Sequence, residues 1–261
     1  MTPEPSLRAA CDVAVTLARE AGALQLRERP GVTVRATKAH RNDLVSDVDL
    51  ASEALIVDGL RAAFPDDGIL GEEGESTAGT SGRRWVVDPL DGTRNYLSAA
   101  GPWSVCIGLQ QGTDLVLGVV HDPALGETFS AVAGGGCHLD GRPVRASSCT
   151  RLDEALAGLS FDQSVATKER MAPVVAALLP VVGDIRRIPA ALHLAYLASG
   201  RLDCAMLVGA KLWDVAAGLV LAREAGVVLG DPVAPELVVA AAPGVWREYA
   251  ATAAVQQLTA S

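Results

Sequence analysis

Two aspartates, Asp88 and Asp91, follow an apolar pair in the segment VVDPLDGT, which covers residues 86–93. Carboxylates this close repel each other and raise each other's pKa unless a cation lies between them. Hard divalent cations such as Mg²⁺ take oxygen ligands and commonly lie between carboxylates and a substrate phosphate. Gly92 favours a turn, and the amides of Gly92 and Thr93 could face an anion if a helix begins there. Taken alone, the segment fits a surface turn equally well.

Three further groups of acidic residues lie at junctions between apolar segments. They are Asp43, Asp47 and Asp49; Glu72 and Glu73; and Asp214. Each group alone has an ordinary explanation, as a helix cap or a solvated loop. Chain ends can converge at such junctions, so a shared metal site explains the four groups better than independent coincidence.

These segments resemble the blocks of the inositol monophosphatase family. DPLDGTRN (88–95) matches the family signature D-P-[LI]-D-G-T-x-N, and WDVAAG (213–218) resembles its C-terminal W-D-x-A-A-G motif. GEEG (71–74) and DLVSDVD (43–49) match the remaining blocks in order and spacing, and AVAGGGCHLDGRPV (131–144) looks like the family's G-x-G-A-x-x-N-G hairpin. The resemblance covers nearly the whole chain. It implies an Mg²⁺-dependent, lithium-sensitive phosphomonoesterase that acts on a small phosphorylated metabolite.

The resemblance also implies the metal ligands, residue by residue. Glu72, Asp88 and the carbonyl of Leu90 would bind a first Mg²⁺. Asp88, Asp91 and Asp214 would bind a second, and Glu72 with water molecules a third. The expected cofactor is therefore two to three Mg²⁺ ions.

The catalytic and substrate-binding roles are carried over in the same way. Asp49 and Thr93 would orient and deprotonate the attacking water, with Glu72 as the third catalytic residue. The amides of Gly92 and Thr93 would hold phosphate oxygens, and Asp91 would lie near the substrate ring. The substrate site would be completed by Ala190, Leu207 and Asp214, and Lys38 matches a family lysine upstream of DLV.

Metal ions suit this reaction because a phosphate monoester is already negatively charged. They neutralise that charge, generate a hydroxide-like nucleophile near neutral pH and stabilise the leaving alkoxide. No covalent serine or cysteine nucleophile is then needed. We expect surface or structural roles for His40, His121, His138 and His193, and packing roles for the five cysteines.

Two positions in the substrate pocket depart from the family pattern. Leu207 stands where inositol-specific relatives have a glutamate, and leucine accepts no hydrogen bond from a ring hydroxyl. Ile188-Pro189 replaces a Gly-Ser or Gly-Thr pair before Ala190. The substrate is therefore left open among an inositol-monophosphate-like or other cyclitol or sugar phosphate, histidinol phosphate, fructose 1,6-bisphosphate and adenosine 3′,5′-bisphosphate. A non-catalytic family member is a further alternative, and an acidic calcium-binding protein would need a D-x-D-x-D-G loop that the chain lacks.

The elements that position these residues can be read from hydrophobic periodicity. A helix is expected from the cap Ser6 to RPG at 29–31, and a second from 46 to 64, with Ser46 and Asp49 as a capping box variant. From residue 84 short strands and turns indicate an antiparallel sheet, and after 150 strands alternate with helices, which indicates a more parallel α/β sheet.

These patterns define the expected fold class and its division into halves. Residues 1–150 would form an α+β half with most metal ligands, and 151–261 an α/β half with Asp214 and the alcohol pocket. Because no linker separates the halves, we expect one body. The resemblance implies a layered α-β-α-β-α fold of the sugar-phosphatase type and a homodimer.

Composition limits the functional class. The chain has 261 residues, and its net charge of −9 disfavours a nucleic-acid surface, which would need a basic stripe. Five scattered cysteines fit a reducing compartment. Neither a leader peptide nor a bilayer-spanning apolar run is visible. We therefore expect a cytoplasmic protein without a membrane partner.

Overall fold

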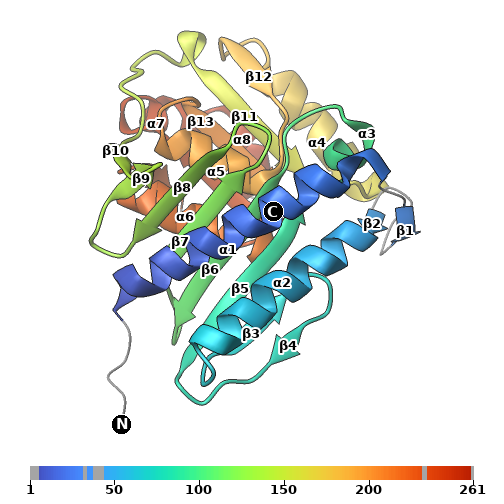
Figure 1. Cartoon of the computed structure of the whole chain (residues 1–261). Coiled ribbons are helices and arrows are strands. Elements are labelled where there is room, and N and C mark those ends of the chain that lie inside the picture. Colours follow the sequence, from blue (N-terminus) through green and yellow to red (C-terminus); the bar gives the residue numbers. More distant parts are fainter. Residues whose placement is uncertain (1–5, 32–33, 38–43, 231–233, 260–261) are drawn as a thin grey trace.

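The protein is folded into five alternating layers of helices and strands (Figure 1). The structure is a computed structural model, which describes residues 6–31, 34–37, 44–230 and 234–259. Helices α1 (Leu7–Glu28) and α2 (Asp47–Ala63) cover the outer face of an eight-stranded sheet. Helices α5 (Ala190–Ala198) and α6 (Leu212–Glu224) lie between this sheet and a five-stranded sheet. The far face of the second sheet packs against α4 (Val165–Leu178), α7 (Pro243–Ala250) and α8 (Ala253–Thr259). The layered α-β-α-β-α fold is confirmed.

The first sheet is antiparallel except for one pair. Its strand order is β10-β9-β8-β7-β6-β5-β3-β4, and only β3 and β5 run parallel among these neighbours. The strands are β3 (Gly68–Gly71), β4 (Ser76–Thr77), β5 (Arg83–Asp91), β6 (Ser104–Gln111), β7 (Asp114–Asp122), β8 (Glu127–Val132), β9 (Cys137–Leu139) and β10 (Arg142–Val144). A separate pair, β1 (Val34–Thr37) and β2 (Leu44–Ser46), precedes α2.

The second sheet is mixed, with order β12-β11-β13-β15-β14. Its strands are β11 (Leu156–Phe161), β12 (Asp184–Arg186), β13 (Cys204–Val208), β14 (Val228–Leu229) and β15 (Leu237–Ala241). β11 pairs in parallel with β12 and β13, because α4 and α5 return the chain to the same edge before each new strand. β15 is antiparallel to both β13 and β14. The second sheet is therefore more parallel than the first, as expected, but only over half of its pairings.

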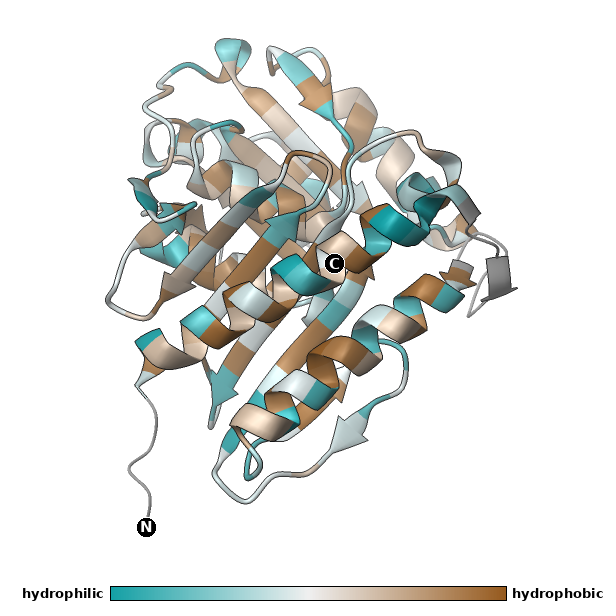
Figure 2. Ribbon diagram, viewed as in Figure 1, coloured by the Kyte–Doolittle hydropathy of each residue, from teal (hydrophilic) through white to brown (hydrophobic). Residues whose placement is uncertain are grey.

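Strand alternation gives each face of the first sheet its own core. On β6, Val105 and Ile107 pack beneath α1 and α2, whereas Cys106 faces α5 and α6. Figure 2 shows hydrophilic positions on the outward face of α1 and hydrophobic positions along the strands beneath it. Among the described residues, no helix is both long and hydrophobic enough to cross a bilayer.

The predicted starts of the first two helices are confirmed. Ser6 caps α1 by accepting a hydrogen bond from the Ala9 amide at 3.2 Å. Ser46 and Asp49 form the capping box of α2, in which the Ser46 amide donates to Asp49 Oδ2 at 2.9 Å. A short 3₁₀ turn over Arg29–Gly31 ends the first helical segment. Local sequence therefore fixes where these two helices begin.

Small residues let α6 approach the first sheet closely. A Cβ atom on Gly118 of β7 would lie 2.1 Å from the carbonyl oxygen of Ala217, so a larger residue would collide with the helix backbone. Gly108 is the cross-strand neighbour of Gly118 and faces the same turn of α6. On the other side of α6, a Cβ on Gly218 would meet Leu194 of α5 at 2.6 Å. The first half of α6 is thereby held against β6 and β7, next to the strand β5 that carries Asp88.

Candidate active site

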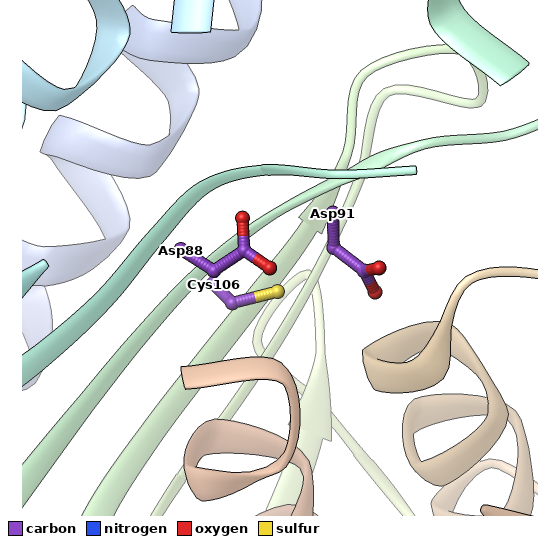
Figure 3. Close-up of side chains that lie close together, drawn as sticks. All are labelled: Asp88, Asp91 and Cys106. Atoms are coloured by element: carbon purple, nitrogen blue, oxygen red, sulfur yellow. The ribbon is translucent and has the colours of Figure 1, made fainter. Parts of the chain in front are cut away.

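Asp88 and Asp91 lie together at the end of β5, on the side of the sheet that faces α6. Asp88 pairs with Cys106 across the β5–β6 register, and the register is irregular between Asp88 and Asp91. One ligand atom from each of Asp88, Asp91 and Cys106 lies within 4.8 Å of the other two (Figure 3). The cluster could hold a metal ion, and the irregular register turns Asp91 toward the same point as Asp88.

Glu72 and Asp214 complete this carboxylate cluster. Burial raises the pKa of Asp88 well above its usual range, and the negative charges of Glu72, Asp91 and Asp214 raise it further. Interaction with the nearby Glu72 side chain adds a smaller upward contribution to the pKa of Asp88. Burial and the Asp214 charge raise the pKa of Asp91 to about 8. Glu72 and Asp214 therefore lie near Asp88 and Asp91, and the Asp88 carboxyl is only 1% exposed.

Three helix N-termini surround the cluster and hold its side chains. Asp214 belongs to the first turn of α6 and accepts a hydrogen bond from the Lys211 amide at 2.6 Å. Asp91 accepts one from the Ala191 amide at 2.8 Å, so a residue of β5 caps α5. Asp49 lies in the first turn of α2. Since helix N-termini favour negative charge, the backbone partly offsets the repulsion within the cluster.

The predicted pair of Thr93 and Asp49 is in hydrogen-bond contact. Thr93 opens the short helix α3 (Thr93–Ser98), and its hydroxyl donates to Asp49 Oδ1 at 3.0 Å. The Leu90 carbonyl lies 3.2 Å from the same hydroxyl. Ser46 donates to Asp49 Oδ2 through both its amide and its hydroxyl. Both oxygens of the buried Asp49 carboxylate are thus engaged, which fixes its orientation toward Thr93.

A cavity of about 610 Å³ opens beside the cluster. Of the predicted substrate residues, Asp91, Gly92, Ala190 and Asp214 line it. Gly92 has φ +97°, and a Cβ there would lie 2.7 Å from Pro189 Cγ, so the position requires glycine.

Leu207 does not line the cavity, which corrects its predicted place. Its side chain is fully buried in the core with α5 and α6, because residues alternate along β13 and this position faces the helices. Ile188 and Pro189 do line the cavity, as expected from the departures in sequence.

The family can now be identified from comparison with known proteins. The profile of the inositol monophosphatase family matches residues 7–259. The chain belongs to this family. It is accordingly a phosphoric monoester hydrolase, in agreement with the catalytic class expected from its motifs.

The similarity to known proteins covers most of the chain. It is 43% identical over 233 residues to the inositol-1-monophosphatase of Mycobacterium bovis, covering 84% of this chain and 80% of that protein. It is 36% identical over 225 residues to the Nus factor SuhB of Escherichia coli K12, covering 84% of each. The solved structure of Mycobacterium tuberculosis SuhB superposes with a TM-score of 0.83 at 37% identity, covering 97% of this chain and 98% of that one.

The donor chemistry of the family member's cluster fits a hard divalent cation. Glu72, Asp88, Asp91 and Asp214 offer carboxylate oxygens, which Mg²⁺ prefers. Cys106 is the one soft donor beside them among the described residues, and its thiol pKa is raised, first by burial and then by the Asp88 charge. The sequence predicts packing roles for all five cysteines and so misses the position of Cys106 at the cluster. The position follows from the strand register, in which Cys106 of β6 pairs with Asp88 of β5.

Two buried polar residues that position the site are also missed by sequence reasoning. Gln25 of α1 donates from Nε2 to the Pro89 carbonyl at 2.7 Å and accepts from Trp103 Nε1 at 2.8 Å. Glu53 of α2 accepts from the amides of Glu73 and Glu75 at 2.9 and 3.3 Å, and so holds the loop that carries Glu72. Glu53 follows Asp49 by four residues, which places both on one helix face. That spacing is the feature of the sequence from which the place of Glu53 beside the site can be predicted.

The other residues singled out in the sequence lie outside the cluster or outside the described residues. Lys38, His40 and Asp43 lie outside the described residues. His121 contacts Thr128 and the Glu127 carbonyl, and His193 contacts the Pro189 and Arg186 carbonyls. Burial lowers the pKa of both imidazoles. These contacts agree with structural roles for the two histidines.

Proposed function

We propose that the protein hydrolyses a small phosphate monoester by attack of a metal-activated water molecule, with two to three Mg²⁺ ions as cofactor. The observation that carries this proposal is that Glu72 and Asp214 come from separate segments to lie near the β5 pair Asp88 and Asp91, beside a cavity that Asp91 and Asp214 line. Such a cluster is electrostatically unfavourable on its own and becomes favourable around divalent cations. The family membership supports the same chemistry.

The carboxylates of the cluster would divide the metal ions among them. Glu72, Asp88 and the Leu90 carbonyl would hold one ion, and Asp88, Asp91 and Asp214 another, while Glu72 would also face a third. When bound, the ions supply charge neutralisation, an acidified water and stabilisation of the leaving oxygen. The part of the four carboxylates is thus to hold the cations beside the phosphate position.

Asp49 and Thr93 would handle the proton of the attacking water. Their 3.0 Å contact supports this assignment, because the Thr93 oxygen can accept from water while it donates to Asp49. The raised pKa of the buried Asp49 carboxyl favours uptake of a proton. The amides of Gly92, which lines the cavity, and of the adjacent Thr93 are proposed to bind phosphate oxygens.

The test is phosphate release from a panel of monoesters. We expect activity with Mg²⁺, its loss on EDTA treatment, its recovery on adding Mg²⁺ back, and inhibition by Li⁺. Asp88→Asn should lower kcat by roughly a thousandfold, comparable to the removal of a main electrostatic contact in other enzymes. Asp114→Asn, a change at the exposed start of β7, is the matched control. Activity that survives EDTA would contradict metal catalysis, and a folded protein without turnover on any ester would favour a non-catalytic role.

We also propose that the protein works as a homodimer in the cytosol. The family resemblance supports the dimer, and five free cysteines fit a reducing compartment. Sedimentation equilibrium of the purified chain tests the dimer directly, because its mass of 26.9 kDa would double.

A further inference from the structure

The cavity beside the carboxylate cluster carries cationic side chains that the proposed metal chemistry does not use. They are Arg94 of α3, Lys168 of α4 and Arg187, which lies between β12 and α5. Three separate segments, α3, α4 and the connection from β12 to α5, thus supply positive charge to one cavity in a chain whose net charge is −9. The bound cations and the cationic side chains would each attract an anionic group. Their presence in one cavity therefore indicates a ligand with more than one anionic group.

The acidic residues of the same wall are already engaged. Asp91 and Asp214 belong to the carboxylate cluster. Asp162 accepts hydrogen bonds from the amide of Ser164, the N-cap residue of α4, and from the Thr167 hydroxyl, each at 2.7 Å. Away from the metal cluster, a ligand that enters the cavity would therefore meet one hydrogen-bonded carboxylate, Asp162, and the three cationic side chains.

Arg187 is held in a fixed position at this wall. Its Nη2 donates to the Phe161 carbonyl at 3.1 Å, and its guanidinium carbon lies 4.1 Å from the centroid of the Phe161 ring. Stacking and one hydrogen bond orient the planar group, and this bond uses only one of the several N–H donors that a guanidinium carries. A guanidinium oriented in this way is suited to bind phosphate or carboxylate.

We infer that the alcohol half of the substrate carries a second acidic group, a phosphate or a carboxylate, which Lys168 and Arg187 bind. This inference rests on the proposed phosphatase function. It is consistent with the rest of the pocket, since Leu207 is buried in the core and Ile188 and Pro189 offer no side-chain acceptor for a hydroxyl. Asn95, Ser160 and Gln163 also line the cavity and can bind hydroxyl groups, whereas Lys168 and Arg187 are suited to a second acidic group.

The inference separates the substrate classes that the sequence left open. A sugar or nucleoside bisphosphate presents one phosphate to the metal cluster and a second acidic group to the cationic wall. Histidinol phosphate would instead place an ammonium group in the cavity, where Lys168 and Arg187 would repel it. An inositol monophosphate offers only hydroxyl groups there. The doubly acidic class fits best.

The experiment compares two matched pairs of esters. Fructose 1,6-bisphosphate is compared with fructose 6-phosphate, and 2-phosphoglycerate with glycerol 2-phosphate, so each pair differs by one acidic group. We expect KM for the doubly acidic member of at least one pair to be roughly tenfold lower, the size typical of a charge-assisted contact. In Lys168→Met and Arg187→Met this ratio should fall toward one. Arg186→Met is the control, because Arg186 is exposed and paired with Asp184.

The outcomes distinguish this inference from the proposed function. Equal KM values within both pairs would overturn the second-anion site while leaving the phosphatase intact. A preference that persists in the Lys168→Met, Arg187→Met double variant would overturn it as well. Turnover of none of the four esters with Mg²⁺ present would instead contradict the proposed function. Circular dichroism and thermal melting of each variant confirm that it is folded, so that a changed ratio reports on binding.

Discussion

At the scale of single residues, the site depends on buried polar side chains that take no part in the proposed chemistry. Gln25 is fully buried and links α1 to the Pro89 carbonyl, to Trp103 and, at 3.2 Å, to Ser52. Its own backbone carbonyl accepts from the Tyr96 hydroxyl at 2.7 Å. The Gln25 side chain therefore satisfies several groups that would otherwise be buried without partners, and it fixes the irregular end of β5 between Asp88 and Asp91.

Replacing Gln25 by leucine should destabilise both the fold and the metal site. Leucine leaves the Pro89 carbonyl and the Trp103 N–H buried without this partner, which costs about 3 kcal/mol for two such groups. Urea unfolding measures the loss, and the Mg²⁺ concentration for half-maximal activity should rise because the end of β5, from Asp88 to Asp91, is less restrained. Gln110→Leu removes a half-buried partner of Arg84 near the end of β6 and should stay within about 0.5 kcal/mol of the parent. Unchanged stability of Gln25→Leu would refute the positioning role.

At the scale of elements, the close packing of α6 on the first sheet places Asp214 beside Asp88. Gly118→Ala should push the helix away, since the new methyl group would lie 2.1 Å from a backbone oxygen that has no freedom to rotate aside. Overpacking of this kind costs roughly 1–3 kcal/mol. Gly108→Ala is the milder variant for comparison, because its Cβ would lie 3.2 Å from the Ala216 side chain and so would clash less. Calorimetry should show the larger loss of Mg²⁺ affinity in Gly118→Ala, and equal effects would argue against this geometry.

Sequence reasoning identifies the elements whose signals are local. The capping box at Ser46 places Asp49, and the signature from 88 to 95 places the β5 carboxylates, so the sequence alone suffices to assign these residues. Leu207 cannot be placed in this way. All five residues of β13 are buried, so the strand shows no polar alternation to tell which face a residue takes. Gln25 and Cys106 act through partners far away in sequence, and no local pattern marks such contacts.

At the scale of the whole molecule, the proposed metal site joins the two halves of the chain. The first sheet and α1 and α2 come from residues before 145, whereas α5, α6 and the second sheet come from residues after 155. Asp91 of the first half caps α5 of the second, and Asp214 of the second half approaches Asp88 of the first. The division into halves at residue 150 remains a prediction. Because these contacts cross between the halves, any separation of the halves would break the carboxylate cluster.

Mg²⁺ should therefore stabilise the chain as one cooperative unit. At a free concentration of 100 times Kd, binding to the native state alone contributes about 2.7 kcal/mol. For a chain of this size, that corresponds to a rise in Tm of roughly 5–10 °C. Differential scanning calorimetry should show a single transition that moves upward with Mg²⁺ and moves less in Asp214→Asn, which removes the ligand from the second half. Two transitions, of which only one responds to Mg²⁺, would show that the ion is held by one half alone.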